Sequence, residues 1–452
     1  MKKLIILAAF AMFLKGANAQ FIPEPLNFPG NNYFSDFNDA VDSNTVWVGT
    51  IFTDTAYESY SKAIKTTDGG QTWQFYNIPD SGNQIIISNV CAVDSDHCYY
   101  TLYNGTGGAV WKTENGGSTW TKKTTTQFVG GWPNFYHSFS ADTGIAGGDP
   151  NNGYWEIQRT NDGGNTWSRV PSANIPASLS GEYGTSSSYS ASGNYIWFAS
   201  GRGRCYRSTD KGLNWTVRQV ASTGNNYDVC FVDSLHGVFW QPYPVAKKSV
   251  SAYNTFFRST DGGLTWSPRS LDSNYRLRDF CSVPGTNGGL LISAYDMSRS
   301  GELTVLYTPD FLNTFSVIDT GLLSDGYMSF RSSTAGWLSG FGTMHLDIFK
   351  FRGNLDPFMG VRETSRNGLK VNVCPNPSSD KATLQVLTTK IQTAMTLKVT
   401  DAEGRELENR RITSGSNLIR LNATKYANGV YLISLTLDNG ESAVCRWVVC
   451  HR

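Results

Sequence analysis

Five short segments of the chain each carry an Asp or Asn five residues before a tryptophan. Repeated carboxylates of this kind could take part in acid–base chemistry. Residues 258–266 read RSTDGGLTW, and four earlier segments are near-copies. Hydrolysis of a glycoside, for example, needs two carboxyl groups on either side of one bond. Five copies spread along the chain cannot meet at one substrate, so we expect a structural role. The Asp or Asn would accept hydrogen bonds from backbone N–H groups of a turn, and the Trp would bury apolar area. The repeated positions are Asp68, Trp73, Asn115, Trp120, Asp162, Trp167, Asp210, Trp215, Asp261 and Trp266.

Other acids and histidines could converge by folding. Two carboxylates near the centre of the fold would suit a glycosidase, and the candidates are Asp149, Asp228, Asp279 and Asp296. His137 and His236 stand apart from any Ser or Cys nucleophile pattern. The chain has no G-x-S-x-G, H-E-x-x-H or P-loop motif, and no Cys/His cluster with the spacing of a zinc site. We therefore expect no metal and no cofactor.

The repeated segments are evenly spaced, which indicates repeated structural units. Their acceptor residues follow at intervals of 47, 47, 48 and 51 residues, and a degraded copy, TPDFLNTF, places Asp310 a further 49 residues along. Each interval holds four short apolar segments separated by polar turns, as in YDVCFVDSLHG, GVFW, FFRST and TWSPRSL. Four antiparallel strands in a unit of this length are typical of a β-propeller blade.

Seven first strands can be counted along the chain, from the one that includes Ala40 to the one that begins at Phe330. The seventh unit lacks a fourth strand, and FIPEPLN at residues 21–27 resembles the strand that follows a repeated segment. We therefore expect the N-terminal segment to close the ring, which removes exposed sheet edges. The sequence predicts an all-β chain with a seven-bladed β-propeller over residues 20–354.

The pattern S/T-x-D-x-G-x-T-W resembles the Asp-box, or bacterial neuraminidase repeat, of sialidases, sortilin-type receptors, xyloglucanases and photosystem II assembly factors. The second glycine of each copy is expected at positive φ, and Lys211 replaces the first glycine in one copy. A sialidase also needs an arginine cluster, a Tyr nucleophile with a Glu partner and an Asp acid/base. Glu182-Tyr183 and YRLRD at residues 275–279 offer these residue types. However, Phe21 stands where the family's Arg-Ile-Pro motif has its arginine.

The loops opposite the Asp-box turns are rich in aromatic residues, which stack on sugar rings or anchor protein partners. Packing between blades is the other use of such residues, and the sequence does not separate the two. The candidate ligand-binding residues are Trp132, Tyr136, Trp155, Tyr183, Tyr227, Tyr275, Arg276 and Tyr295. The favoured function is binding of a glycan or protein partner. The alternatives are a glycoside hydrolase, sialidase-like or other, acting at the axial pocket, and a non-catalytic assembly or scaffold factor.

The periodicity stops near Leu355, and residues 355–370 read as a linker. Alternating strands separated by NP, EG and NG turns then predict a small Ig-like β-sandwich over residues 371–452. The segment resembles the type A sorting domain of Bacteroidota type IX secretion cargo. The resemblance rests on Pro375-Asn376-Pro377, residues 401–404, ANGVY at 427–431 and the basic end His451-Arg452. It implies recognition by the outer-membrane translocon, followed by cleavage of the segment and attachment of the mature protein to surface lipopolysaccharide.

The first 19 residues have the pattern of a signal peptide. Lys2 and Lys3 precede an apolar run, and Ala17-Asn18-Ala19 forms an A-x-A cleavage site. No later apolar stretch is long enough to span a bilayer. Lys and Arg number 38 against 37 Asp and Glu, so the formal charge of +1 offers no field for nucleic acid. We expect export across the inner membrane and then to the cell surface or medium.

Export permits disulfides, and the chain has eight cysteines. In CAVDSDHC a hairpin could bring Cys91 and Cys98 together, so they form a candidate disulfide. Cys374 and Cys450 could clasp the C-terminal segment. Cys230 and Cys281 occupy equivalent places in two repeats and are also explained as small buried hydrophobes.

Overall fold

A computed structural model defines the chain in two compact units, residues 1–355 and 356–452. The residues it describes are 20–24, 33–53, 59–80, 85–124, 126–222, 226–243, 253–286, 288–322, 327–341, 346–355, 370–374, 378–387, 394–401, 404–412, 418–438, 442–449 and 451. The signal peptide, the linker after Leu355, Pro375–Pro377 and Cys450 lie outside the described residues. Among those described, no helix is long and apolar enough to cross a membrane.

The described part of the first unit contains seven four-stranded antiparallel sheets, and six of them use four consecutive strands. In chain order, the first sheet contains β2 (Tyr33–Ala40), β3 (Val46–Thr53), β4 (Ser59–Thr66) and β5 (Gln74–Tyr76), and the second contains β6 (Ile86–Ala92), β7 (Cys98–Tyr103), β8 (Gly108–Thr113) and β9 (Thr121–Lys122). The third sheet contains β10 (Pro133–Ser138), β11 (Gly144–Asn151), β12 (Tyr154–Thr160) and β13 (Ser168–Arg169), and the fourth contains β14 (Gly184–Ser192), β15 (Tyr195–Ser200), β16 (Arg204–Ser208) and β17 (Trp215–Gln219). The fifth sheet contains β18 (Asp228–Phe231), β19 (Gly237–Trp240), β20 (Thr255–Ser259) and β21 (Ser267–Ser270), and the sixth contains β22 (Tyr275–Ser282), β23 (Leu290–Asp296), β24 (Glu302–Thr308) and β25 (Ser316–Leu322).

The seventh sheet joins the two ends of the unit. β1 (Phe21–Pro23) pairs with β28 (Leu346–Phe351), which continues to β27 (Gly336–Phe341) and β26 (Tyr327–Phe330). Phe21 lies opposite Phe351 and is fully buried among aromatic rings of this sheet. The N-terminal strand therefore completes the last sheet, as the sequence predicts.

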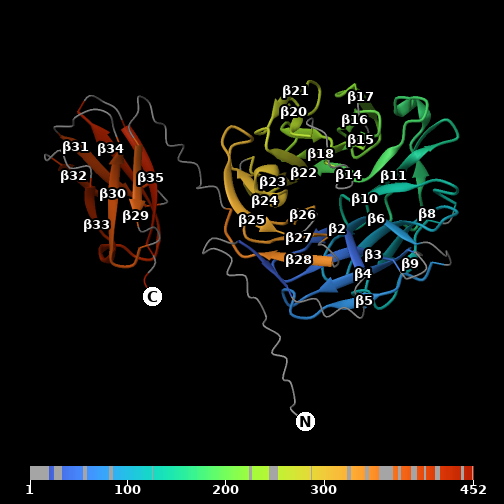
Figure 1. The fold of residues 1–452 in the computed structure, drawn as a ribbon, viewed down its shortest axis with the longest axis horizontal. Coiled ribbons are helices and arrows are strands. Elements are labelled where there is room, and N and C mark those ends of the chain that lie inside the picture. The colour runs from blue at the N-terminus through green and yellow to red at the C-terminus, as the bar shows by residue number, and fades with distance from the viewer. Residues whose placement is uncertain are drawn as a thin grey trace, which may run out of the picture. The chain divides into compact units, whose positions relative to one another are not determined.

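The first strands of the sheets surround a common axis. Each contacts the first strand of the next sheet, and β26 contacts β2, so the series closes on itself. Figure 1 shows these strands around the centre, with the last strands, such as β5, β9, β21 and β25, at the periphery. Apolar clusters between neighbouring sheets fill the space between them. This arrangement is a β-propeller.

The Asp-box turns join the third and fourth strands and have the predicted bonding. Asp261 Oδ1 accepts from the Thr265 N–H at 2.9 Å and from the Ser259 hydroxyl at 2.9 Å. Gly263 has φ +88° and Gly262 φ +75°, so both positions are left-handed. Lys211 takes the first of these positions in its copy with φ +57°, where a side chain is strained.

The second unit is a two-sheet sandwich. One sheet contains β29 (Lys370–Cys374), β30 (Lys381–Leu387) and β33 (Leu418–Asn422). The other contains β32 (Glu406–Ile412), β31 (Met395–Thr400), β34 (Gly429–Leu437) and β35 (Ser442–Val449). Alternate residues of β31 and β34 are buried, and both sheets contribute to one apolar core. Short 3₁₀ turns occur in the first unit at η1 (Ser172–Asn174) and η2 (Met297–Arg299), and in the second unit at η3 (Ala423–Lys425).

The candidate disulfide between Cys91 and Cys98 is wrong. Both thiols are free and buried. Cys91 lies opposite Tyr99 and Cys98 opposite Ala92, so the two side chains point to opposite faces of the hairpin. They belong to different apolar clusters, one on each side of the sheet. Cys230 and Cys281 are also free and buried, whereas the side chains of Cys374 and Cys450 lie outside the description.

Candidate binding site at the propeller axis

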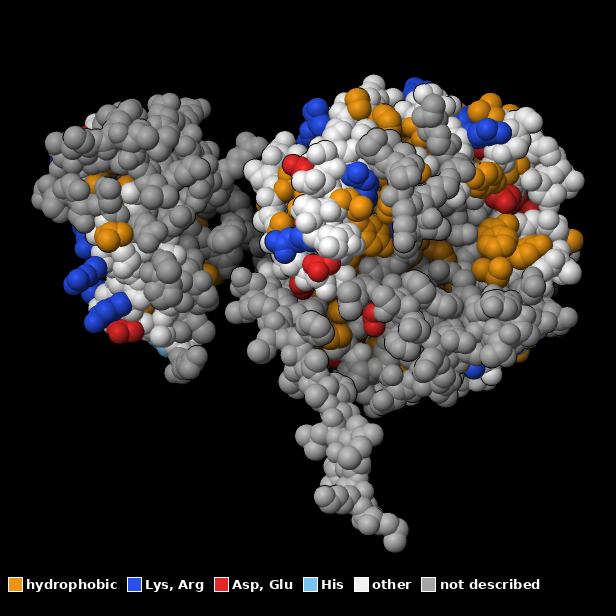
Figure 2. All heavy atoms as spheres, viewed as in Figure 1, with side chains coloured by type: hydrophobic (Ala, Val, Ile, Leu, Met, Phe, Trp, Pro, Cys, Tyr) orange, Lys and Arg blue, Asp and Glu red, His pale blue; other side chains and the backbone are white. Residues whose placement is uncertain are grey.

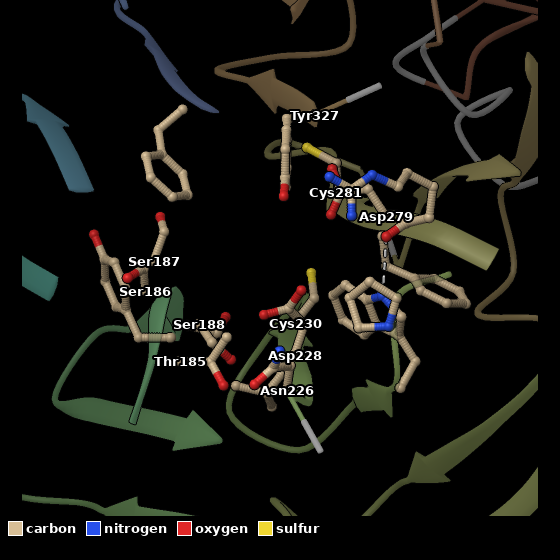
Figure 3. A pocket seen from close by; sticks show the side chains of 18 of the residues that line it. Thr185, Ser186, Ser187, Ser188, Asn226, Asp228, Cys230, Asp279, Cys281 and Tyr327 are labelled. Carbon is tan, nitrogen blue, oxygen red and sulfur yellow. Dashed lines mark hydrogen bonds between the residues drawn. The ribbon is translucent and has the colours of Figure 1, made fainter. Parts of the chain in front are cut away.

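A cavity of about 640 Å³ opens along the axis of the propeller. Side chains of several first strands line it, together with loops at one end. Figure 3 shows Ser186 and Ser187 on one side of the open space, with Asp279, Cys281 and Tyr327 across from them, and Asp228 and Cys230 between the two groups, beside Ser188. The polar and aromatic residues that face it include Trp132, Asp149, Tyr183, Asn226, Tyr243 and Arg278.

The hydroxyl-rich wall is an irregular part of β14. Gly184 pairs with Ser200 and Tyr189 with Phe198, so residues 185–188 form a bulge. The indole N–H of Trp132 donates to Ser186 Oγ at 3.0 Å, and Asn89 Nδ2 donates to Ser187 Oγ at 3.0 Å. Two earlier sheets thus hold the bulge in place. Residues 185–188 are not among the predicted ligand-binding residues, although the run of serines in a first strand was an available signal.

Asp228 and Asp279 form the acidic side of the cavity. Burial raises the pKa of Asp228 to about 6, although the Ser188 hydroxyl and Arg278 act in the opposite direction. Burial, with a further contribution from Asp228, raises the pKa of Asp279 to about 7. Both carboxyl groups stay half-buried because they face the cavity. The Arg278 guanidinium lies 4.2 Å from the centre of the Tyr327 ring.

Asp279 also has a structural role. Its Oδ2 accepts from the Met328 N–H, in the first strand of the next sheet, at 2.9 Å. Asn89 makes the equivalent bond, accepting from the Tyr136 N–H at 3.0 Å. Each acceptor lies three residues before the end of its strand. An uncharged amide can therefore fill this position, so the Asp279 bond does not require a catalytic acid.

A second set of acceptors lies still closer to the ends of the first strands, one or two residues before the last residue of each. Asp39 Oδ2 accepts from the Ala92 N–H at 2.8 Å, and Ser329 Oγ accepts from the Ala40 N–H at 2.9 Å. Ser190 Oγ accepts from the Phe231 N–H at 2.9 Å. These side chains satisfy N–H groups that the innermost strand of each sheet leaves unpaired. Burial raises the pKa of Asp39 to about 6.

Two of the predicted ligand-binding residues line the cavity, namely Trp132 and Tyr183. Three others are core residues, which corrects the prediction. Tyr136 stacks on Tyr99 at 4.2 Å, Trp155 packs on Phe198 at 5.0 Å, and Tyr227 stacks on Phe239 at 5.0 Å. All three are at most 4% exposed, so they present no face to a ligand.

The remaining predicted residues lie at the ends of β22 and β23. Arg276 is opposite Tyr295, and Tyr275 is opposite Asp296. The Arg276 guanidinium donates to the carbonyl oxygens of Ser273 and Tyr275. Tyr295 lies 5.8 Å from Tyr243, which faces the cavity, so this group borders the site without lining it.

The Glu–Tyr arrangement of a sialidase is not formed at residues 182–183. Glu182 is 5% exposed and accepts from Arg204 at 2.7 Å. Tyr183 instead donates its hydroxyl to Asn226 Oδ1 at 2.8 Å. Glu182 is therefore committed to a buried ion pair and does not activate Tyr183.

The other candidate residues offer little reactivity. Burial lowers the pKa of His137 to about 4, with Arg331 acting in the same direction, so the imidazole is neutral. Burial raises the pKa of the Cys230 thiol to about 12 and also raises the pKa of the Cys281 thiol well above its usual value, so neither is a thiolate at neutral pH. His236 pairs with Asp233 at 2.8 Å in a turn. Among the described residues, no group of three His, Cys, Asp or Glu side chains could hold a metal ion.

The outer surface carries both signs of charge. Over the coloured part of the face in Figure 2, basic and acidic side chains are mixed with polar and apolar ones, and none forms a large field of one sign. The concentration of carboxylates around the axis is therefore a local feature of the cavity. The cavity is therefore the principal candidate binding site in the part of the chain that the structure describes.

Comparison with known families supports the two-part organisation. Residues 372–449 match the secretion system C-terminal sorting domain, and residues 257–268 match the BNR/Asp-box repeat. No curated protein matches the chain. The sorting domain indicates export by type IX secretion to the cell surface or the extracellular space.

Solved structures share the propeller fold. One, described as YCF48 bound to D1 peptide, is 14% identical with a TM-score of 0.53, over 75% of this chain and 97% of that chain. Another, YCF48 from Cyanidioschyzon merolae, is 14% identical with a TM-score of 0.50, over 74% of this chain and 99% of that chain. At this identity the likeness concerns the fold alone.

Proposed function

We propose that the chain is an exported, non-catalytic binding protein whose axial cavity holds a basic side chain of a partner protein. The observation that carries this proposal is the make-up of the cavity. Asp149, Asp228 and Asp279 face it, and Arg278 is the cationic residue among the described residues that line it. A cationic group would offset the cost of burying these carboxylates.

The walls of the cavity suit the rest of a side chain. The Trp132 ring stacks on the Tyr103 ring at 4.7 Å, which fixes its position beside the cavity. Tyr183 and Tyr243 also line the cavity. Aromatic rings of this kind pack on the methylene groups of Lys or Arg and attract the cation itself. The hydroxyl groups of residues 185–188 add hydrogen-bonding partners for a peptide backbone.

The comparisons are compatible with a peptide ligand. A propeller of the same fold is described as bound to a peptide. The signal peptide that we expect at residues 1–19 would take the chain across the inner membrane, and the sorting domain directs the second step. The partner would accordingly be a protein of the cell surface or the surrounding medium.

Binding to a library of defined peptides tests the proposal. Lys- or Arg-containing peptides should bind the exported protein, and Asp228→Asn should weaken that binding by about tenfold or more, since a charged hydrogen bond is lost. Asp142→Asn, in an exposed turn, is the matched control and should bind as the unaltered protein does. Binding should also weaken below about pH 6, where Asp228 takes up a proton. Binding of glycans alone would contradict the proposed partner class.

A second candidate, glycoside hydrolysis, is favoured by one observation. The carboxyl groups of Asp228 and Asp279 face the same cavity, and burial raises the pKa of both, as a carboxyl group that serves as a general acid requires. The bond from Met328 to Asp279 argues for a structural role instead. Release of reducing sugar from a panel of polysaccharides, lost in both Asp228→Asn and Asp279→Asn, would establish this candidate and displace the first.

A further inference from the structure

Asp319, near the middle of β25, holds the start of the propeller chain. Its Oδ2 accepts from the backbone nitrogen of Gln20 at 2.9 Å and from that of Phe21 at 2.8 Å. Its Oδ1 accepts from the Thr320 N–H at 2.9 Å. The residue is 6% exposed. A nearly buried carboxylate in the sheet of β22–β25 thus accepts a hydrogen bond from a backbone nitrogen that is 299 residues away in the sequence.

The position of the Gln20 nitrogen is fixed on both sides. The Gln20 carbonyl oxygen accepts from the Arg352 N–H at 2.8 Å, and the strand register continues through Phe21 opposite Phe351. The Phe21 ring lies 5.3 Å from that of Phe351 and 6.2 Å from that of Phe330. The nitrogen therefore stays beside Asp319 for as long as β1 is paired with β28.

Asp319 has no described cation as partner. None of the Lys, Arg or His side chains in the described residues forms an ion pair with it. The charged groups nearby have other contacts: Arg352 pairs with Glu24 at 2.8 Å, and Lys350 Nζ lies 3.4 Å from Asn44 Oδ1. Glu302, on the adjacent β24, is a further acid close to Gly321. Three backbone nitrogens already donate to this carboxylate, and a cation at the Gln20 nitrogen would make one of these bonds charge-assisted.

We propose that Asp319 binds the free amino group of Gln20, and that removal of residues 1–19 thereby locks the propeller closed. Hydrolysis of the Ala19–Gln20 peptide bond consumes one water. It leaves a carboxylate on the released segment and an amine on Gln20, which takes up a proton at neutral pH. The hydrogen bond from Gln20 to Asp319 then becomes a partly buried ion pair. Export processing and ring closure are coupled through one side chain.

The proposal has a direct consequence for the dependence of stability on pH. An α-amino group ordinarily titrates near pH 8, and an adjacent carboxylate raises its pKa in the folded protein. The added stability is therefore fully present below about pH 8 and is lost as the pH rises through the higher, folded-state value. An amide nitrogen, as in the unprocessed chain, would not titrate.

The test uses the protein exported from cells that express the full chain. After digestion of this protein, mass spectrometry should find an N-terminal peptide that begins with an unmodified Gln20. The melting temperature is then measured from pH 7 to pH 10.5 for the unaltered protein and for Asp319→Asn. Burial lowers the pKa of Lys350, a group that both proteins share, so the readout is the difference between the two proteins. That difference should be largest near pH 7 and shrink steadily above pH 8.

Two controls separate this ion pair from general destabilisation. Asp310→Asn alters a turn in the same sheet and should lower the melting temperature by the same amount across the range. Acetylation of the α-amine in the folded, unaltered protein should be at least about tenfold slower at pH 8 than in a peptide that starts with the same residues, because the amine is protonated and covered. A constant difference between the proteins, equal acetylation rates, a different first residue or a cyclised Gln20 would each overturn the proposal.

Discussion

The side-chain nitrogen of Lys65 lies 2.8 Å from the carbonyl oxygen of Gly116, in the Asp-box turn of the following sheet. It also lies 3.1 Å from the Ser95 carbonyl oxygen and 4.6 Å from the centre of the Trp47 ring. Arg159 reaches the next turn in the same way, with Nε 2.9 Å from the Lys211 carbonyl oxygen. At these two Asp-boxes the preceding basic residue therefore connects one sheet to the turn of the next.

Replacing Lys65 with Met should lower the free energy of unfolding by about 1–3 kcal/mol, because two buried carbonyl oxygens lose their donor. Lys123→Met serves as the comparison. Its side-chain nitrogen lies 3.1 Å from Asn165 Oδ1 in an exposed contact with a neutral partner, so the change should stay within about 0.5 kcal/mol. Urea denaturation of both variants checks the expectation. Equal small effects would mean that the link between sheets adds no stability.

Lys211→Gly should stabilise the protein by about 0.5–1 kcal/mol, since glycine adopts the left-handed backbone of this position without strain. The reverse change has a matched site. Gly262, at the same place in another Asp-box, has φ +75°, and a β-carbon there would lie 2.9 Å from the Ser234 carbonyl oxygen. Gly262→Lys should therefore destabilise. The urea midpoints of the two variants should move in opposite directions, and a shift in the same direction would contradict this account.

The Asp-box tryptophans should differ in their contribution to stability. Trp215 is 6% exposed and packs 5.2 Å from Phe198, whereas Trp266 is only half-buried, 5.9 Å from Phe231. Trp215→Ala should cost about 3–5 kcal/mol, the range for a buried large aromatic residue. Trp266→Ala should cost less. Thermal melting ranks the two variants, and peptide binding by the folded fraction of each should persist.

Asp279→Asn should be tolerated and should change how stability depends on pH. The folded-state pKa of Asp279, about 7, lies above the ordinary value for Asp, so the folded protein binds more protons than the unfolded chain. Stability should therefore fall as the pH rises from about 4 to 7 and then level off. An Asn keeps an acceptor for the Met328 N–H, as Asn89 shows, and removes this contribution. Denaturation at pH 4.5 and 7.5 should show a smaller difference in the variant, and an unchanged difference would exclude Asp279 as its source.

The fold could be predicted from the sequence because each unit carries its own signals. The Asp-box fixes the turn between two strands through local hydrogen bonds, and its repetition reveals the period. The terminal FIP segment could be assigned because the last unit lacked a strand. The register of the hairpin at Cys91 and Cys98 was the exception. The spacing of two cysteines in a hairpin does not determine which face of the sheet each side chain occupies. A shift of the strand register by one residue moves a side chain to the opposite face.

The site was less predictable for a physical reason. In a propeller, an aromatic residue near the end of a first strand can pack between sheets or face the axis, and one residue decides between them. Trp132 and Tyr136 illustrate this: they are four residues apart, yet Trp132 lines the cavity and Tyr136 is buried between sheets, because the strand register shifts by a bulge between Pro133 and Phe135. The bulge in β14 depends on donors from two other sheets. Such contacts between distant segments leave no local pattern in the sequence.

The end of the propeller offers a last prediction, which joins stability to export. Leu355 is 4% exposed, its N–H donates to the Ser333 carbonyl oxygen at 2.7 Å, and its own carbonyl oxygen accepts from the Tyr307 hydroxyl at 2.9 Å. A chain that ends at Leu355 should therefore melt at a higher temperature than one that ends at Gly353, which loses these contacts. Both chains lack the sorting domain that matches residues 372–449. Fractionation of cells should find both in the periplasm and the full chain at the surface or in the medium. Should the chain that ends at Leu355 reach the surface as efficiently as the full chain, the second unit would have another role, and its groove beside Tyr426 and Tyr431 would become the place to look for a ligand.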